Sequence, residues 1–428
     1  MRDMAIDHVP AVHVPPLGER VPRRAVLAGG VAAGLVLGAG QLGAGLLGSG
    51  AAAGAPSILK PLPPERFTDF GTNAEMRWES VDPRRYLTPQ ADLFVRNHTA
   101  TPRVDPATYR LRVFGDGLRE ARNEARAHEL SLRDLRRLPV TRILGVHECT
   151  GNGRSFFRTQ QGQSVSGTAW TLGSVGAVVW EGVRLRDVLR SLGVRGDAVS
   201  VQATGLDAPF VSGGTDYGRV RRPFPVQKAL DDALLAWGGD GEALLPDHGY
   251  PLRLVLPGWV GIASIKWLGS LEISRGQLTS PWNTTFYRMT GGGYPPDSPP
   301  LTVNPVRSAL ELPWRAALPR RPELTLTGRS WSGLAPVRRV EVSTDGGERW
   351  TEARLERRGG VHGRGGTRAV RGHGWTRWSH SWRRPTSGEH EVLVRATDQR
   401  GRTQPLETPY NDAGYFFDAV VRHPVTVG

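Results

Sequence analysis

A segment dense in glycine and proline, SPWNTTFYRMTGGGYPPDSPP, occupies residues 280–300 and separates two parts of the chain with different hydrophobic patterns. The segment has no hydrophobic period, and its many Gly and Pro residues favour turns over helices and strands. We therefore predict an irregular connector there. A chain of 428 residues is also too long for one ordinary core, so the connector is expected to lie between two domains.

The part of the chain before the connector mixes the periods of helix and strand. Ser131 stands where an N-cap is expected, directly before leucines at helical spacing. We therefore expect a mixed α+β domain over residues 57–290. Its predicted strands lie within 108–115, 250–258 and 264–274, and its predicted helices lie within 130–138 and 183–194.

The part after the connector alternates apolar and polar residues throughout, which is the period of a strand with one buried face. Turns such as Asp345-Gly346-Gly347 separate the alternating segments. Several short strands at this spacing are typical of a β-sandwich, and we predict one of immunoglobulin type over residues 300–428. The alternating segments are 323–331, 337–355, 375–382 and 390–401.

The first 56 residues have the layout of an export signal. Arg23 and Arg24 precede an uncharged stretch rich in Ala, Gly, Leu and Val at 25–48, and three alanines follow at 51–53. This order predicts a twin-arginine signal segment over 1–56 and a periplasmic or other extracytoplasmic location. The alternative is a retained membrane anchor; a cleaved signal would contact the membrane only transiently.

The chain has a single cysteine, Cys149. One thiol excludes an intramolecular disulfide, a thiolate zinc cluster and an iron–sulfur cluster. Cys149 is then a buried filler, a nucleophile or one ligand of a metal. It follows the apolar run 140–148 and opens the turn CTGNGR, in which the nearby Arg154 favours the thiolate form.

The net charge of +14 comes almost entirely from arginine, because lysine occurs only at Lys60, Lys228 and Lys266. Codon usage explains most of these arginines, and a few are expected to bind oxyanions through their planar guanidinium groups. No basic run is interleaved with aromatic residues, and no helix-turn-helix or zinc-finger pattern is present. We therefore expect no nucleic-acid partner.

The loop C-x-G-N-x-R at 149–154 resembles the molybdenum-binding loop of the sulfite oxidase family. Three further segments resemble that family in the same order, and so does the β-rich C-terminal part. The resemblance runs from about residue 70 to about residue 405. The three segments are DLFVRNHTATP at 92–102, GTDYG at 214–218 and LPDHGYPLRLVLPGWVGIASIKWLG at 245–269.

The resemblance implies a molybdenum cofactor with one pyranopterin dithiolene, and Cys149 as the protein ligand of the metal. Arg96 and Tyr217 match the substrate-side arginine and tyrosine of the family, and Arg154 offers a second positive charge. A fork-shaped guanidinium suits a trigonal oxyanion. The residues that match cofactor-binding positions are Asn97, His98, His248, Arg253, Ser264 and Lys266.

The implied activity is that of a molybdopterin-dependent oxidoreductase. It would oxidise sulfite, or a related sulfur oxyanion, to sulfate by oxygen-atom transfer and pass electrons to an external acceptor such as cytochrome c. The resemblance also implies a homodimer formed through the β domain. Two alternatives stay open: sulfane dehydrogenase or S-/N-oxide reductase activity with the same cofactor, and an exported binding protein without catalysis.

Several positions depart from the family pattern. Ala263 stands where the family often has an arginine, and Arg377 is shifted by one residue from a family arginine that reaches the substrate. Gly153 replaces an arginine in the cysteine loop. Trp170 aligns with a tryptophan near the site, but a place in the core is equally compatible with its sequence context.

Overall fold

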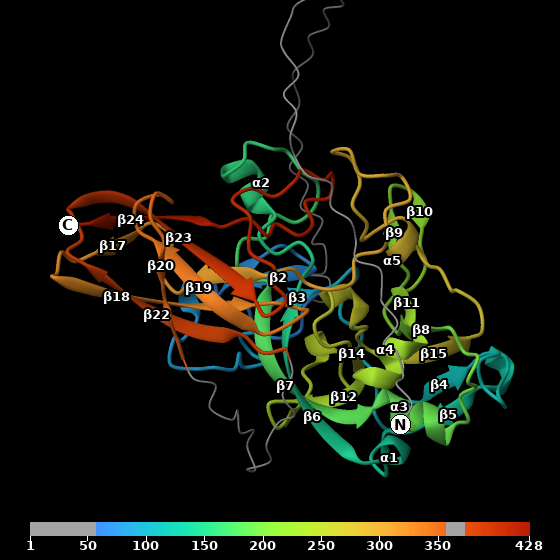
Figure 1. Cartoon of the computed structure of the whole chain (residues 1–428). Coiled ribbons are helices and arrows are strands. Elements are labelled where there is room, and N and C mark those ends of the chain that lie inside the picture. Colours follow the sequence, from blue (N-terminus) through green and yellow to red (C-terminus); the bar gives the residue numbers. More distant parts are fainter. Residues whose placement is uncertain (1–56, 357–372) are drawn as a thin grey trace, which may run out of the picture. The chain divides into compact units, whose positions relative to one another are not determined.

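The structure, a computed structural model, describes residues 57–356 and 373–428 (Figure 1). The predicted signal segment at 1–56 lies outside the described residues. Within the described ranges, no helix is both long enough and apolar enough to cross a membrane. Strands dominate these ranges, and the helices between them are short, as the predicted α+β class requires.

One antiparallel sheet carries the cysteine loop. Its strand order is β13-β12-β7-β6, and β14 also pairs with β12. The strands β6 and β7 pair along their whole length, from Val140 opposite Val183 to Glu148 opposite Val175. Because β6 ends at Glu148, Cys149 is the first residue beyond the end of this strand. The bounds are β6 Val140–Glu148, β7 Val175–Arg184, β12 Leu234–Gly239, β13 Glu242–Ala243 and β14 Arg253–Val255.

A second sheet has the order β11-β8-β15-β4-β5, in which only the β15–β4 pair is parallel. Short helices pack with this sheet around one apolar core. The bounds are β4 Leu111–Phe114, β5 His128–Leu130, β8 Ser200–Gly205, β11 Arg221–Pro225, β15 Leu268–Ser274, α1 Leu132–Leu135, α3 Leu185–Ser191 and α4 Val226–Asp231.

The predicted start of the first helix is confirmed in atomic detail. The Ser131 hydroxyl accepts a hydrogen bond from the Asp134 amide at 3.2 Å, and the Asp134 carboxylate accepts one from the Ser131 amide at 3.0 Å. This reciprocal capping box satisfies two backbone donors that a helix of only four residues would otherwise leave free.

Smaller elements complete the N-terminal part. The sheet β1-β2-β3 ends at Arg96, and the hairpin β9-β10 lies before β11. The predicted connector 280–300 is irregular except for α5, but it also contributes Tyr287, which is 5% exposed, to the main core. The bounds are β1 Phe67–Asp69, β2 Asn73–Met76, β3 Val95–Arg96, α2 Ser155–Thr159, β9 Val211–Ser212, β10 Thr215–Asp216 and α5 Pro281–Thr284.

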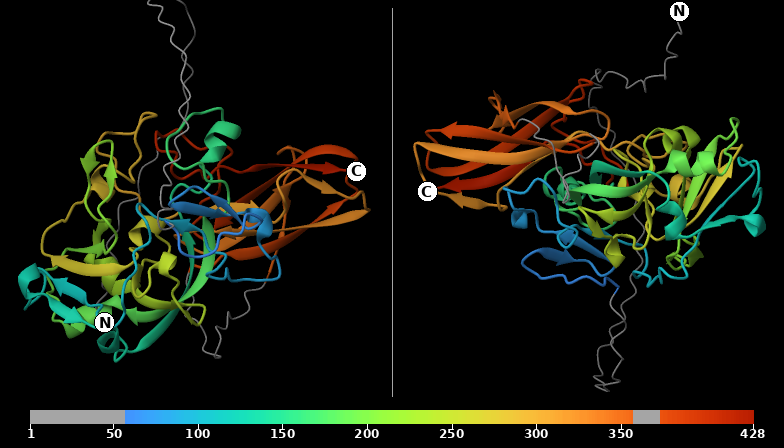
Figure 2. Two further views of the ribbon diagram at one scale, coloured as in Figure 1. Left: turned by 180° about the vertical axis from the view of Figure 1, so that it is seen from behind. Right: turned by 90° about the horizontal axis from the view of Figure 1, so that it is seen from below.

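The C-terminal part forms two sheets, of orders β16-β18-β22-β21 and β17-β24-β23-β19-β20 (Figure 2). Leu326 and Trp378 of the first sheet share one buried cluster with Val340 and Val394 of the second. The predicted β-sandwich is therefore confirmed, and its immunoglobulin type stays a prediction. The bounds are β16 Arg307–Leu310, β17 Ala316–Leu318, β18 Glu323–Trp331, β19 Val337–Ser343, β20 Thr351–Glu352, β21 Arg354–Leu355, β22 Thr376–Arg383, β23 Gly388–Asp398 and β24 Arg422–Val427.

Candidate active site

A cavity lies where the end of β6 meets β3 and the loops around β14. It contains about 700 Å³ of space between atoms, counting its open mouth, a volume typical of cofactor sites. Eight of the ten predicted site residues line it: Arg96, Asn97, His98, Cys149, His248, Arg253, Ser264 and Lys266. The cavity therefore brings together segments that are far apart in the sequence, from Leu93 to Tyr287.

Cys149 lies at the turn that follows β6. Its amide donates a hydrogen bond to the Ser174 carbonyl at 2.9 Å, and its carbonyl accepts one from the Asn152 amide at 2.9 Å. Burial raises the pKa of the Cys149 thiol, while the positive charges of Arg96 and Arg154 act in the opposite direction. The two guanidinium groups thus favour the thiolate, which is the form that binds metals.

The two glycines of the cysteine loop make room for arginine side chains. A Cβ on Gly151 would lie 2.5 Å from the Arg154 guanidinium, and one on Gly153 would lie 2.5 Å from the Arg307 guanidinium. Gly153 also has a φ of +82°, a conformation that other residues rarely adopt. The loop therefore bends closely around two buried cations.

Three cations reach the cavity from different elements. Arg253 donates to the carbonyls of His248 at 3.1 Å and Ser264 at 3.2 Å, and Lys266 donates to the Asp247 carbonyl at 2.8 Å. Burial lowers the pKa of Arg253 to about 9 and the pKa of Lys266 well below its usual range. None of the ion pairs within the described ranges includes these two side chains.

Arg96, at the end of β3, is the third cation. Its guanidinium donates to the Asn97 carbonyl, to Asn73 Oδ1 at 3.4 Å and to His98 Nε2 at 3.1 Å. All three partners are neutral, so the positive charge of Arg96 has no carboxylate beside it among these contacts. Arg96 and Arg253 thus line the cavity with one carboxylate, that of Asp207, and an anionic ligand would balance the remaining positive charge.

Three histidines in the cavity wall supply neutral hydrogen-bonding groups. Burial and the neighbouring cations lower the pKa of His98, His147 and His248 well below the usual range. His98 Nε2 accepts from both Arg96 and the Trp282 indole, so its own proton lies on Nδ1. His147, which contacts Arg253 at 3.2 Å, was missed by the sequence reasoning because it lies within β6, where an alternating position has no local mark of function.

The predicted site tyrosine requires a correction. Tyr217 does not line the cavity, because its ring packs 4.9 Å from Phe286 and 6.0 Å from Phe210. The tyrosine in the cavity wall is Tyr287, from the segment that the sequence marks only as a connector. Its ring stacks on Tyr415 at 5.2 Å, and the charges of Arg96 and Cys149 act on its hydroxyl.

Arg154 also lies outside the cavity lining. Its guanidinium donates to the Ala413 carbonyl at 2.7 Å and to the Thr168 carbonyl at 2.9 Å, and it lies over the Tyr415 ring. The positive charge of Arg154 lowers the pKa of the Cys149 thiol, and the substrate role that the sequence suggests for Arg154 stays a prediction.

Two family models match the chain. The model described as "Oxidoreductase molybdopterin binding domain" matches residues 98–282, and "Mo-co oxidoreductase dimerisation domain" matches 302–427. Sulfite oxidase of Gallus gallus is 33% identical over 383 residues, which cover 83% of this chain and 77% of that protein. The chain belongs to the sulfite oxidase family. It is therefore a molybdopterin-dependent oxidoreductase, and its cofactor is molybdenum-molybdopterin.

A second sulfite oxidase and a solved structure are also similar to this chain. Mitochondrial sulfite oxidase of Mus musculus is 36% identical over 287 residues, 63% of this chain, but the match spans only 50% of that protein. The crystal structure of the sulfane dehydrogenase SoxCD from Paracoccus pantotrophus matches with a TM-score of 0.66 and 27% identity, over 81% of this chain and 82% of that one.

The residues present fit the family's cofactor. Among the cavity residues, Thr150 Oγ1, Asp207 Oδ1 and Arg253 Nε are buried without a hydrogen-bond partner, so a ligand with several polar groups would satisfy them. Burial also raises the pKa of Asp207 to about 6. Like His147, Asp207 was missed by the sequence reasoning.

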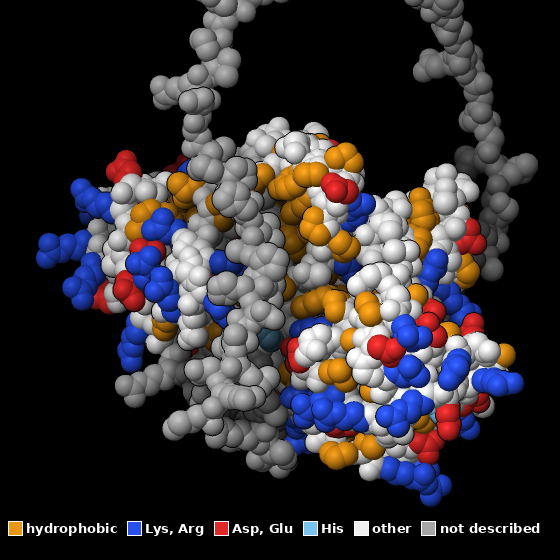
Figure 3. Space-filling model, turned by 45° about the vertical axis from the view of Figure 1, so that its right-hand side comes forward, with side chains coloured by type: hydrophobic (Ala, Val, Ile, Leu, Met, Phe, Trp, Pro, Cys, Tyr) orange, Lys and Arg blue, Asp and Glu red, His pale blue; other side chains and the backbone are white. Residues whose placement is uncertain are grey.

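The structure shows the surroundings of three residues that the sequence comparison singled out: Ala263, Arg377 and Trp170. Ala263 is buried beside the cavity, and Arg377 lies away from it, contacting the Pro83 carbonyl and Glu356 at 3.4 Å. Trp170 is fully buried in the same apolar cluster as Cys149. On the face drawn in Figure 3, red side chains lie among the blue ones, so the positive charges visible there do not form one stripe.

Proposed function

We propose that this enzyme oxidises sulfite, or a closely related sulfur oxyanion, to sulfate and passes the electrons to an external acceptor such as cytochrome c. The observation that carries the proposal is the cavity itself, in which the only thiol of the chain lies with Arg96, Arg253 and Lys266. An excess of buried positive charge selects an anionic substrate and an anionic cofactor.

The residues divide into two groups in this proposal. The cofactor, when bound, supplies a metal that accepts two electrons and exchanges an oxygen atom, and Cys149 would hold that metal. Arg96 would bind the substrate anion, and the Tyr287 hydroxyl would donate a hydrogen bond to a substrate oxygen. The residues that would hold the pterin and its phosphate are Asn97, His98, His248, Arg253, Ser264 and Lys266.

Two measurements on the purified protein test the proposal. Elemental analysis should find about one molybdenum per chain, and sulfite should reduce cytochrome c or a dye in its presence. Cys149→Ala should remove the metal. A Cys149→Ala protein that retains molybdenum and activity would exclude the assignment of the thiol.

Arg96→Gln tests the anion site separately from the metal. We expect KM for sulfite to rise and kcat to fall by about 100-fold or more, because a charged hydrogen-bond donor at the substrate is lost. The metal content should not change. Wild-type kinetics in Arg96→Gln would mean that the substrate binds elsewhere.

A second candidate activity is sulfane dehydrogenase. The similarity to the SoxCD structure over 81% of the chain favours it specifically. Both activities need the same cofactor and an anionic group on the substrate, so the cavity is compatible with either. Parallel assays with sulfite and with a sulfane-sulfur donor separate them, and turnover of an S- or N-oxide with a reduced dye would indicate a reductase. A metal-free protein without turnover would be a binding protein.

We also propose export through the twin-arginine route. The support is the order of Arg23, Arg24, the uncharged stretch 25–48 and the alanines at 51–53. Replacing both arginines with lysine should retain the protein in the cytoplasm, as fractionation would show. Unchanged export of that variant would contradict the route.

A further inference from the structure

A buried arginine of the β-sandwich contacts the cysteine loop. Arg307 begins β16, and its side chain is only 4% exposed. Its Nη1 donates to the Asn152 carbonyl at 2.6 Å and lies 3.4 Å from Glu148 Oε1. Arg307 therefore reaches both sides of Cys149, the residue before it and the turn after it, from the second domain.

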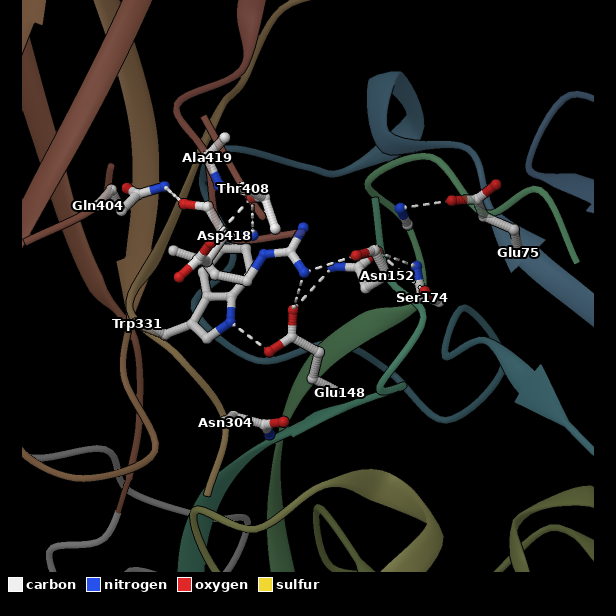
Figure 4. Close-up of polar contacts among 12 residues, drawn as sticks. Glu75, Glu148, Asn152, Ser174, Asn304, Trp331, Gln404, Thr408, Asp418 and Ala419 are labelled. Carbon is white, nitrogen blue, oxygen red and sulfur yellow. Dashed lines mark hydrogen bonds and ion pairs between the residues drawn. The ribbon is translucent and has the colours of Figure 1, made fainter. Parts of the chain in front are cut away.

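Glu148 receives a second contact from the same domain. Its Oε2 accepts a hydrogen bond from the Trp331 indole at 2.9 Å, and its Oε1 accepts one from Asn152 Nδ2 at 2.9 Å (Figure 4). The Glu148 side chain is 1% exposed, so both of its oxygens depend on protein partners. A buried carboxylate that lost either partner would leave its position.

The network closes on the backbone of the cysteine. Asn152 Oδ1 accepts from the Ser174 hydroxyl at 2.9 Å (Figure 4). The Ser174 carbonyl accepts from the Cys149 amide at 2.9 Å. The position of the thiol is thus determined by a continuous set of bonds that begins at Arg307 and Trp331. A Cβ at residue 153 would clash with the Arg307 guanidinium, so the absence of a side chain at Gly153 allows Arg307 to approach the loop.

We propose that Arg307 and Trp331 are positioning residues, through which the β-sandwich holds the Cys149 loop in the geometry that the metal requires. The inference rests on the proposed role of Cys149 as the metal ligand. Arg307 also places a positive charge 3.4 Å from Glu148, the residue next to Cys149, so it acts on the electrostatics of the site as well as on its shape. Outer partners of metal ligands commonly act in this way.

The test compares matched variants of the molybdenum-loaded enzyme. In Arg307→Met, and in Trp331→Phe, which removes the indole donor together with part of the ring, we expect molybdenum to be lost on dialysis about 10-fold faster than in the wild type. In Arg307→Met the midpoint potential of the metal should also fall, because a cation that favours the reduced, more negative site is gone. Arg307→Lys should restore the potential.

The controls are equally buried side chains of the same domain that do not contact the loop. Arg329 in β18 pairs with Glu311, and Trp378 in β22 donates to Ser330 Oγ at 3.1 Å. Arg329→Met and Trp378→Phe should keep the wild-type potential and rate of metal loss, even where they lower the melting temperature.

The outcomes separate this inference from the proposed function. If the Arg307 and Trp331 variants match their controls in the rate of metal loss and in the midpoint potential, the inference is wrong. The proposed role of Cys149 as the metal ligand would not be affected by that result. If the wild-type protein binds no molybdenum, or Cys149→Ala retains it, the proposed function fails first.

Discussion

At the scale of single residues, the structure chooses between two tyrosines. Tyr287 lies in the cavity wall with Cys149 and Arg96, whereas Tyr217 packs among Phe210 and Phe286. In the sequence, only Tyr217 lies in a segment that resembles a family motif, whereas Tyr287 lies in the irregular connector. Position relative to the thiol is therefore a tertiary property, which only the folded chain defines.

Tyr287→Phe should lower kcat/KM for sulfite by about 100-fold, because it removes a hydrogen-bond donor at the reacting centre. Tyr217→Phe is the matched control and should change kcat/KM by less than about twofold. Steady-state kinetics at full molybdenum occupancy measure both. Equal losses in the two variants would contradict the choice of Tyr287.

Glu75 makes stability depend on pH. Its carboxylate accepts bonds from the Thr171 amide at 2.7 Å and the Gly173 amide at 2.8 Å, but burial still raises its pKa from 4.5 to about 7. Between these values the folded chain binds more protons than the unfolded chain. The contribution of Glu75 to the free energy of unfolding is therefore full below about pH 4.5 and falls as the pH rises to about 7.

Glu75→Gln should remove this dependence. Relative to Glu75→Gln, the wild type should lose on the order of 3 kcal/mol between pH 4.5 and pH 7, from the pKa difference. Melting temperatures at several pH values measure the trend, with the exposed Glu79→Gln as control. Parallel pH profiles of the wild type and Glu75→Gln would contradict a raised pKa.

At the scale of elements, a glycine of β7 sets how closely β7 and β12 can approach each other. Gly182 of β7 lies so close to β12 that a Cβ there would be 1.9 Å from the Leu235 carbonyl oxygen. The strands of this sheet can approach only because residue 182 has no side chain. In the pairing with β6, Gly182 lies opposite Thr141, seven residues before Glu148 at the end of that strand.

Gly182→Ala should lower the free energy of unfolding by about 3 kcal/mol, because the added methyl separates two buried strands. The molybdenum content of the purified protein should fall with it. Gly196→Ala is a suitable control, because a Cβ at residue 196 meets no atom within 4 Å. Denaturant unfolding of both variants checks the difference, and equal stability would show that the sheet adapts.

At the scale of the whole molecule, the second domain has two surfaces of interest. One contacts the cysteine loop through Arg307 and Trp331. The other is implied by the match of residues 302–427 to a dimerisation domain. We expect a homodimer in solution, whose symmetric interface uses one patch of each sandwich.

Light scattering over a dilution series measures the oligomeric state. The mass should equal two chains at micromolar concentration, and dilution to low nanomolar concentration should reveal any dissociation. A mass of one chain at every concentration would contradict the prediction.

The sequence by itself determined the features that depend on neighbours along the chain. The periods of strand and helix, the Ser131 cap, the irregular segment at 280–300 and the resemblance around Cys149 are all local patterns, and the structure or the comparisons confirm them. Eight of ten predicted site residues line the cavity, whereas Tyr217 and Arg154, which also lie in segments that resemble the family's motifs, do not.

Only the tertiary structure decided which distant side chains meet. Tyr287 replaces Tyr217 in the cavity wall, His147 and Asp207 join it, and Arg307 supports the cysteine loop from another domain. The physical reason is that a cavity and a buried network depend on distances between segments far apart in sequence. No local period, cap or turn records those distances, which are set when the sheets pack.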